Sequence, residues 1–398
     1  MEVSLRSASF QDDPYTTLDT WRSRQPVFSL DPLPGWLVLS YDHFAESLSS
    51  PLLSTDPRIT AFGNPDTVRE KFPFLGWFLE VSGPFRHDST SGHPLKQFAH
   101  SFFSGNSNKT LLSVAIENSC NLVFTGLAEA PLIDIYRDLG IRIASATMSN
   151  LLGFEDGSSE HLANLSLSLL QLQAPARNPL RVLAIDRAIA AAHKLFSNAL
   201  ACSTNQTPPL ISALVRMLNH EEVERDEVLH FLVSLIAAGI DTVANSISYA
   251  IFNTLSMGAT RDLLTWTFEN RWKWVREYLR LRPFTILIPR YARQSCHLFD
   301  MFPVERGDVV WLSPAAAFRD PGTFPRPTEF LPERDLRRVP LFGAHPHHCV
   351  GAGLAKLETT MALSSFCQRF PSVNLQSHGR ILSDFSTIRL EGTLIARA

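Results

Sequence analysis

One stretch near the C-terminus, residues 342–351 with the sequence FGAHPHHCVG, most constrains what this chain can fold into. Cys349 stands directly before a glycine-punctuated turn, and the apolar run at residues 354–366 predicts that a helix follows. Because N–H groups at a helix start favour an anionic sulfur, a cysteine in this place is a strong soft ligand for a metal. Three histidines crowd the positions before it: His345, His347 and His348.

Three chemistries fit these local residues. A cysteine thiolate can hold the iron of a haem, and a set of Cys and His side chains can hold zinc. A reduced, buried cysteine in a histidine-rich turn, with no ligand at all, is the third interpretation. The stretch alone does not decide among them.

The composition describes an ordinary globular protein. The 398 residues include 45% hydrophobic and 19% charged side chains, and a net charge of −3 gives no reason to expect a nucleic-acid partner. The cysteines are odd in number and form no CxxC pair, which indicates a reducing compartment: Cys120, Cys202, Cys296, Cys349 and Cys367. The N-terminal residues show no signal peptide, and the apolar run at residues 231–240 is too short to span a bilayer. We therefore expect a cytoplasmic protein that is not attached to a membrane.

Helical spacing of apolar residues dominates the pattern along the chain. It predicts helices at residues 41–48, 95–103, 109–127, 133–152, 161–172, 180–202, 210–218, 222–257 and 271–281. Short β-like pieces occur at residues 35–39, 284–291 and 308–312, and the C-terminal segment is β-like as well. Residues 56–92, dense in Pro, Gly and Phe, predict a long irregular segment that lines a binding site. With no internal repeat or linker, we expect one domain over residues 1–398, mainly α with small β-sheets.

The long helix predicted at residues 222–257 contains the polar interruption AGIDT at residues 238–242. Gly239 inside a helix costs about 1 kcal/mol relative to Ala, and a buried, unpaired Asp241 would cost more. One interpretation is a tight helix crossing with a satisfied polar pair. The other is a local widening of the helix beside a bound ligand, with Asp241 and Thr242 delivering protons.

Glu277 and Arg280 stand one turn apart as ExxR on the helix predicted at residues 271–281. Such a pair usually lies on the surface and contributes little, but the apolar residues around it favour burial here. Arg334, in the sequence FLPER, supplies a further arginine for a Glu–Arg–Arg network.

The AGxDT helix, the ExxR helix and the FGxxxHxCxG stretch occur in an order that is far more specific than any one of them. Together they resemble the cytochrome P450 family of haem-thiolate monooxygenases, of the soluble bacterial type, and the resemblance covers nearly the whole chain. The segments RYA at residues 290–292 and AFRDP at residues 317–321 agree with it. The resemblance implies the P450 fold, a triangular prism of helices around a buried haem. Zinc becomes the weaker alternative, because no second Cys/His cluster completes a ligand set.

The resemblance implies roles around haem b, which is iron protoporphyrin IX. Cys349 would be the proximal thiolate ligand of the iron, with Phe342 packed beside it and the N–H groups near Gly351 tuning its electron donation. The positions that bind the haem propionates are matched by His347, Arg290 and Lys96.

On the distal side, the resemblance implies that Asp241 and Thr242 form the proton-relay pair, while Glu277, Arg280 and Arg334 are structural. It also implies a pocket whose apolar, Phe-rich walls suit a hydrophobic substrate. The expected wall residues are Phe62, Phe74, Trp77, Phe78, Leu235, Ala238, Ile286, Leu287, Phe385 and Ile388.

The chain departs from the family pattern at several haem-proximal positions. His345 stands where glycine is usual, and Gly92 stands where a histidine is common, with His93 beside it. Lys96 replaces an arginine, which removes bidentate pairing. Phe318 stands where asparagine is common.

The implied function is O₂ activation for the hydroxylation or other oxidation of a hydrophobic small molecule, such as a terpenoid or aromatic alkaloid of secondary metabolism. The same fold can catalyse oxidative cyclisation, coupling or rearrangement, and a haem-thiolate protein can also bind a ligand without turnover. The acid–alcohol pair argues against the peroxide-driven subclass, which typically lacks it.

The electrons for this reaction are expected from a separate partner. The chain has no flavin motif, and the GxG at residues 351–353 lacks the strand and third glycine of a dinucleotide site. We expect a ferredoxin and a ferredoxin reductase, supplied by NADPH or NADH, to serve a monomeric enzyme. The basic residues Arg334, Arg337 and Arg338 precede the Cys349 loop, and they have two interpretations: a docking face for an acidic ferredoxin, or a solvated charge run before a structural loop.

Overall fold

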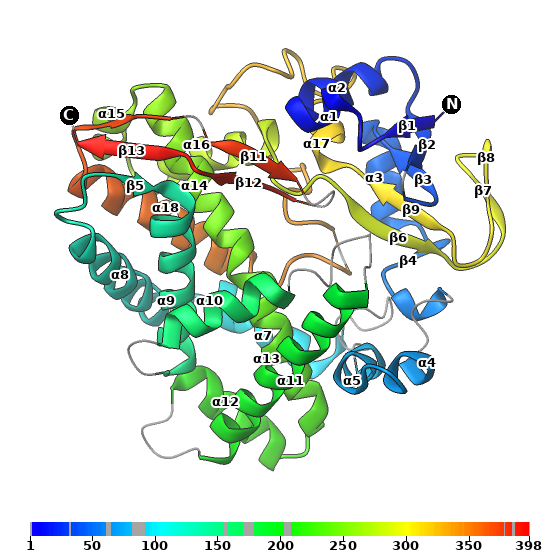
Figure 1. Ribbon diagram of the computed structural model, residues 1–398, viewed down its shortest axis with the longest axis horizontal. Helices are drawn as coiled ribbons and strands as arrows, with labels where there is room; N and C mark the ends of the chain where they lie inside the picture. The colour runs from blue at the N-terminus through cyan, green and yellow to red at the C-terminus, as the bar shows by residue number, and fades with distance from the viewer. Residues whose placement is uncertain are drawn as a thin grey trace.

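Helices make up most of the computed structural model, and small sheets lie mainly on the side that holds the N-terminus (Figure 1). The structure describes residues 2–31, 33–60, 65–81, 92–154, 158–169, 179–202, 208–344, 346–377, 379–383 and 387–397. The prediction of a mainly α fold with small β-sheets is confirmed.

Most of the predicted helices are present, with ends shifted by a few residues. They are α3 (Tyr41–Ser49), α7 (Pro94–Ser104), α8 (Lys109–Gly126), α9 (Ile141–Leu152), α10 (Ser158–Leu169), α11 (Pro179–Ala201), α12 (Pro209–Asn219), α16 (Phe268–Leu281) and α18 (Ala352–Arg369). α9 ends at Gly153, which has the left-handed φ of 72° that glycine permits at a helix C-terminus. At Gly353 in α18, an added Cβ would lie 2.5 Å from the Phe103 carbonyl oxygen. Glycine is therefore what lets α18 approach α7 so closely.

Several short helices were not predicted. They are α1 (Ala8–Asp12), α2 (Pro14–Arg22), η1 (Pro57–Ile59), α4 (Pro65–Arg69), α5 (Pro73–Val81), η4 (Asn106–Asn108), the π-helix η5 (Ile135–Gly140), α15 (Thr260–Thr265) and α17 (Pro314–Ala317). The helix predicted at residues 133–152 therefore begins as a short strand and a π-turn. It becomes α-helical only at α9.

The prediction of an irregular segment at residues 56–92 is wrong where α4 and α5 form. Pro65 and Pro73 stand at their first positions, where the missing N–H of proline is harmless. The Asp186 carboxylate of α11 then accepts hydrogen bonds from the backbone N–H groups of Phe74 and Leu75, both at 2.8 Å. A cap supplied from so far along the chain leaves no local sequence signal.

The strands predicted at residues 35–39, 284–291 and 308–312 appear as β3 (Trp36–Val38), β6 (Ile288–Ala292) and β9 (Val309–Leu312). They belong to a six-stranded sheet with the order β1-β2-β3-β9-β6-β4, whose other members are β1 (Glu2–Ser4), β2 (Val27–Asp31) and β4 (Leu53–Ser54). β5 (Ile133–Asp134), β10 (Val373–Leu375) and β13 (Leu394–Arg397) form a second sheet. Two hairpins complete the set: β7 (Cys296–Leu298) with β8 (Phe302–Val304), and β11 (Arg380–Ser383) with β12 (Ile388–Glu391).

The single long helix predicted at residues 222–257 is two helices, α13 (Arg225–Gly239) and α14 (Asp241–Ser256), which run through the middle of the molecule (Figure 1). The interruption falls at Ile240, beside Gly239, and there the Thr242 hydroxyl donates to the Ala238 carbonyl at 2.6 Å. α14 packs against η5, α9, α16 and α18. By length and composition, residues 225–256 would suffice to cross a membrane, but they are mostly buried, and core helices pass the same test. They are weak evidence for a membrane span.

Candidate active site

The Cys349 loop is held by its own backbone. The Cys349 N–H donates to the Phe342 carbonyl at 2.9 Å, and Gly343 turns the chain with a φ of 76°. Gly351 stands at the N-terminus of α18 and offers its N–H toward the sulfur. The Phe342 ring stacks on Trp272 of α16, with ring centroids 6.3 Å apart. The loop thus presents the sulfur at a helix start, as the sequence predicts.

The Cys349 side chain is accessible, yet enough protein surrounds it that burial raises the pKa of the thiol. The Gly351 N–H acts in the opposite direction and only partly offsets this. A thiol in such surroundings becomes a lasting thiolate only beside a positive centre, because metal-bound thiols are deprotonated. The place of Cys349, on a loop at the start of α18 with an accessible side chain beside the Gly351 N–H, fits an iron ligand better than an inert core cysteine.

At the end of α13, Ala238 is exposed although Ile236, Ala237 and Ile240 around it are buried. An alanine in a core helix stays exposed only where it borders space that protein atoms leave open. Since Ala238 and Gly239 immediately precede the helix break, that space lies beside the interruption in the α13–α14 pair.

Two buried cations lie in segments that flank the site. Arg290 on β6 is 7% exposed and donates to the Pro289 carbonyl at 2.9 Å, while Lys96 on α7 is 4% exposed and donates to the Pro346 carbonyl at 2.6 Å. Burial lowers the pKa of Arg290 to about 10 and lowers the pKa of Lys96. Within the described residues neither side chain has a carboxylate partner. Buried cations without anions are costly, and the two propionates of a haem would relieve both. The residues present therefore fit this cofactor.

The replacement of Arg290 by leucine is expected to speed haem loss by about 10–100-fold, because a supporting contact to the cofactor is removed. The stability of the haem-free protein should not fall, since an uncompensated buried charge disappears with the arginine. Transfer of haem to excess apomyoglobin measures the loss rate. Arg293→Leu, an exposed arginine just beyond the same strand, is the matched control. Equal loss rates in the two variants would contradict a propionate contact at Arg290.

The histidines and the glycine expected near the haem lie in different surroundings. His347 is half-buried, with its Nε2 3.3 Å from the Thr55 hydroxyl. Among the described residues, no atom lies within 4 Å of a Cβ added at Gly92, where a histidine is common in the family. His93 caps α7, and its Nε2 lies 3.1 Å from the Glu227 carboxylate. Both ring nitrogens therefore have structural partners. His348 is exposed and stacks 6.0 Å from His100, and His345 lies outside the described residues.

Asp241 and Thr242 begin α14, and the two side chains have different partners. Thr242 donates to the Ala238 carbonyl, whereas the fully buried Asp241 carboxylate accepts from the Tyr136 hydroxyl, Arg389 and Asn245. Arg389 lies 2.9 Å from Oδ1, and Asn245 lies 3.0 Å from Oδ2. The need for a partner was readable from an acid inside an apolar helix. Tyr136 and Arg389 were missed, because nothing local marks them.

Glu277, Arg280 and Arg334 meet in one buried network. Arg280 donates to both Glu277 oxygens at 2.8 and 2.9 Å, and Arg334 donates to Oε1 at 3.2 Å. Arg280 also reaches the carbonyls of Phe318 and Pro327, and Arg334 reaches those of Pro325 and Arg326. The network therefore ties α16 to the irregular segment before the Cys349 loop.

The predicted pocket residues fall into two groups. In the first, Phe78 and Trp77 of α5 lie beside His230 of α13, with ring centroids 4.3 and 6.5 Å apart, and Trp77 meets His193 of α11 at 4.8 Å. In the second, the Ile388 N–H donates to the Phe284 carbonyl at 2.8 Å, next to the bridge between Thr285 and Thr387. His193, whose pKa burial lowers, and His230 were missed by the sequence analysis.

The predicted wall residues also differ in exposure. Leu235, Ile286, Leu287, Phe78 and Ile388 are buried, while Phe74 and Trp77 are half-buried. Phe62 and Phe385 lie outside the described residues.

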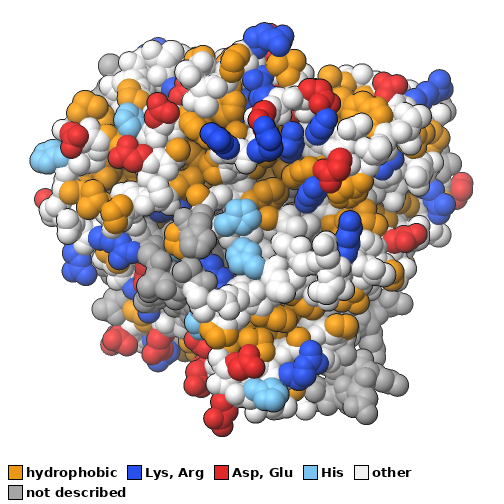
Figure 2. Space-filling view, turned by 180° about the vertical axis from the view of Figure 1, so that it is seen from behind, with side chains coloured by type: hydrophobic (Ala, Val, Ile, Leu, Met, Phe, Trp, Pro, Cys, Tyr) orange, Lys and Arg blue, Asp and Glu red, His pale blue; other side chains and the backbone are white. Residues whose placement is uncertain are grey.

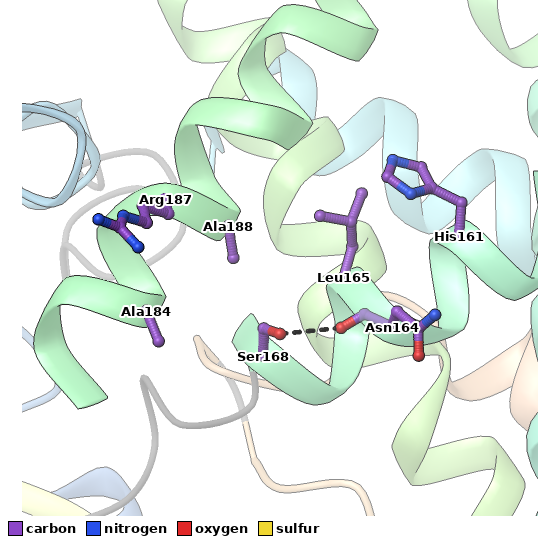
Figure 3. A pocket seen from close by; sticks show the side chains of 7 residues that line it. All are labelled: His161, Asn164, Leu165, Ser168, Ala184, Arg187 and Ala188. Atoms are coloured by element: carbon purple, nitrogen blue, oxygen red, sulfur yellow. Dashed lines mark hydrogen bonds between the residues drawn. The ribbon is translucent and has the colours of Figure 1, made fainter. Parts of the chain in front are cut away.

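A separate cavity of about 350 Å³ opens between α10 and α11. It is lined by His161, Asn164, Leu165, Ser168, Ala184, Arg187 and Ala188 (Figure 3). The Ser168 hydroxyl donates to the Asn164 carbonyl at 3.0 Å on its α10 side. None of the predicted site residues that the structure describes lines it, so we assign it no part in the chemistry.

Comparisons with known proteins agree with this geometry. The family model described as Cytochrome P450 matches residues 273–390, which include the ExxR motif and the Cys349 loop. The chain is 24% identical over 387 residues to a biotin biosynthesis cytochrome P450 of Bacillus subtilis (strain 168), covering 94% of this chain and 93% of the relative. It is 25% identical over 381 residues to the 6-deoxyerythronolide B hydroxylase of Saccharopolyspora erythraea, and the match covers 93% of this chain and 92% of the relative.

Among solved structures, P450BioI in complex with a hexadec-9Z-enoic acid ligated acyl carrier protein is similar in fold. The TM-score is 0.85 at 22% identity, and the match covers 98% of this chain and 100% of that one.

Proposed function

The chain belongs to the cytochrome P450 family of haem-thiolate monooxygenases, and on that basis we propose that it oxidises a hydrophobic small molecule at a haem b held by Cys349. The observation that carries the proposal is the combination of the Cys349 loop with two buried cations that have no carboxylate partner in the described chain. When bound, the haem supplies the oxidising chemistry with O₂. Cys349 would hold its iron, and Arg290, Lys96 and His347 would hold its propionates.

The residues of this chain would supply protons and shape the pocket. The Thr242 hydroxyl already donates to the Ala238 carbonyl, so its oxygen remains able to accept a hydrogen bond and position a proton in the distal space. Asp241 at the same helix start is the buried acid that replenishes that proton. The aromatic residues of α5 and the buried Ile286, Leu287 and Ile388 exclude water from the substrate.

The Thr242→Ala variant is expected to divert electrons from substrate to hydrogen peroxide. With the hydroxyl removed, the product formed per electron pair should fall by about 10-fold or more. Peroxide and product are measured together in the reconstituted system. The Thr242→Ser variant keeps a hydroxyl and should form as much product per electron pair as the parent protein. An equal yield per electron pair in Thr242→Ala and the parent protein would contradict the relay role.

The substrate class follows from apolar walls and from the relatives. One relative is a hydroxylase of 6-deoxyerythronolide B, and a protein of similar fold is bound to an acyl carrier protein that carries a fatty acid. These favour an acyl- or polyketide-derived substrate over the terpenoid or aromatic alkaloid expected from the sequence. Optical titration for a low- to high-spin shift, with fatty acids and macrolides in one arm and terpenes and aromatic alkaloids in the other, tests this choice. A shift confined to the second arm would reverse it.

The electron donor would be a ferredoxin with its reductase, docking near the Cys349 loop. Lys and Arg side chains gather in the upper part of the face seen in Figure 2, with Asp and Glu side chains interspersed among them. The expected docking role of Arg334 is wrong, because its guanidinium is committed to Glu277 and to two carbonyls. Arg337 is exposed and paired with Asp335 at 2.7 Å, and Arg338 is exposed. These two are the arginines left for an acidic partner.

A further inference from the structure

Resting on the proposed function, we propose that Arg389 and Tyr136 are positioning residues for Asp241, and that Arg389 links the substrate wall to the acid that supplies protons. Nothing in the AGxDT pattern identifies either residue. They come from β12 and η5, which are distant from α14 in sequence and meet it in space.

The contacts fix the carboxylate on both of its oxygens. Oδ1 accepts from the Arg389 Nε at 2.9 Å and from the Tyr136 hydroxyl, and Oδ2 accepts from the Asn245 amide at 3.0 Å. Asn245 also donates to the Asp241 carbonyl at 2.9 Å, which locks the first turn of α14. The three donors hold the carboxylate in one orientation, and a donor that water can replace would give solvent protons a route to it.

Of the donors, Arg389 is the one that water can replace. The Asp241 side chain is fully buried, whereas the Arg389 side chain is 15% exposed, so the ion pair reaches from the core toward the surface. Tyr136 is buried, and burial raises its pKa further above neutrality, so its hydroxyl stays a donor. The charged groups around Tyr136 are Asp241, Arg389 and Glu391. Exchange at Arg389 is therefore the step that opens the acid to solvent protons.

The strand that carries Arg389 also forms part of the substrate wall. Ile388, the residue before it, is fully buried, and its N–H donates to the Phe284 carbonyl at 2.8 Å. Thr387 bridges to Thr285, just before the predicted wall residues Ile286 and Leu287. A substrate that shifts this wall would move β12, and with it the guanidinium that holds Asp241. Substrate occupancy and proton supply would thereby be coupled through one strand.

A double-mutant cycle on thermal unfolding of the holoenzyme tests the positioning contact. Arg389→Gln should lower the melting temperature by about 3–6 °C, because it leaves a buried carboxylate without its cation. In the Asp241→Asn background the same change should cost less than half as much, since no charge remains to be paired. Arg137→Gln is the control: Arg137 is 68% exposed and pairs with Glu391 of the same strand at 3.5 Å, so little change is expected. Additive losses in the cycle would overturn the proposal.

A second readout separates positioning from mere packing. The fraction of electrons lost as peroxide, measured with a surrogate ferredoxin and reductase, should rise several-fold in Arg389→Gln and return toward the parent value in Arg389→Lys, which keeps the charge. If the double-mutant cycle shows coupling but Arg389→Gln loses no larger fraction of electrons as peroxide, Arg389 is a structural residue and the role assigned to it is overturned. If the proposed function fails, the parent protein lacks a thiolate spectrum. If only the present proposal fails, the parent protein has the thiolate spectrum, but the melting-temperature losses in the double-mutant cycle are additive or the peroxide fraction of Arg389→Gln equals that of the parent.

Discussion

Replacing Cys349 by serine is expected to abolish the thiolate spectrum and to lower oxidation activity by more than about 100-fold, since the iron loses its protein ligand rather than a supporting contact. The hydroxyl of serine is a weak donor that does not become an anion in these surroundings. Burial already raises the pKa of the thiol it replaces. The measurement is the reduced, CO-bound difference spectrum of purified protein reconstituted with haem.

His348→Gln is the matched control for Cys349→Ser. His348 is the exposed neighbour of Cys349 and stacks on His100, so its loss should leave the spectrum unchanged. A zinc site built from the Cys and His side chains of this loop predicts a different result, in which both variants lose metal and neither protein shows a Soret band.

The second large effect is expected on stability, at Arg280. Arg280→Met should lower the free energy of unfolding by about 3–5 kcal/mol, because the buried Glu277 carboxylate loses one of its two arginine partners and keeps only Arg334. Arg280 and Glu277 are both fully buried, and Arg280 also holds the Phe318 and Pro327 carbonyls. Urea denaturation measures the change.

Arg326→Met is the control for Arg280→Met. Arg326 is 64% exposed and pairs with Glu329 at 3.0 Å, so its removal should change the free energy of unfolding by no more than about 0.5 kcal/mol. Similar losses in the two variants would contradict a special role for the buried network. A soluble Arg280→Met protein with parental stability would do the same.

The helices could be predicted where apolar spacing and end signals agree. α8, α9 and α16 have strong helical spacing, and Gly153 marks the end of α9 by itself. α5 could not be predicted, because the carboxylate that caps it belongs to Asp186 on α11. The interruption at Ile240 could be predicted only in part. Gly239 and Asp241 are unfavourable inside an apolar helix, but the hydrogen bond from Thr242 to the Ala238 carbonyl is known only from the structure.

The candidate site divides in the same way. Cys349, Glu277 and Arg280 stand in short motifs whose spacing carries their chemistry, so they could be proposed as site residues from the sequence. The sequence also required that Asp241 have a partner, since a buried carboxylate cannot stay alone. It did not identify Tyr136 or Arg389, because tertiary contacts over more than a hundred residues leave no trace in local pattern.

The central claim, that Cys349 presents a thiolate to a haem iron, is tested most directly by the reduced, CO-bound difference spectrum of the unmodified holoprotein. The account predicts a Soret band strongly red-shifted from that of histidine-ligated haem, and its loss in Cys349→Ser. A histidine-type band, or haem binding that survives unchanged in Cys349→Ser, would contradict it.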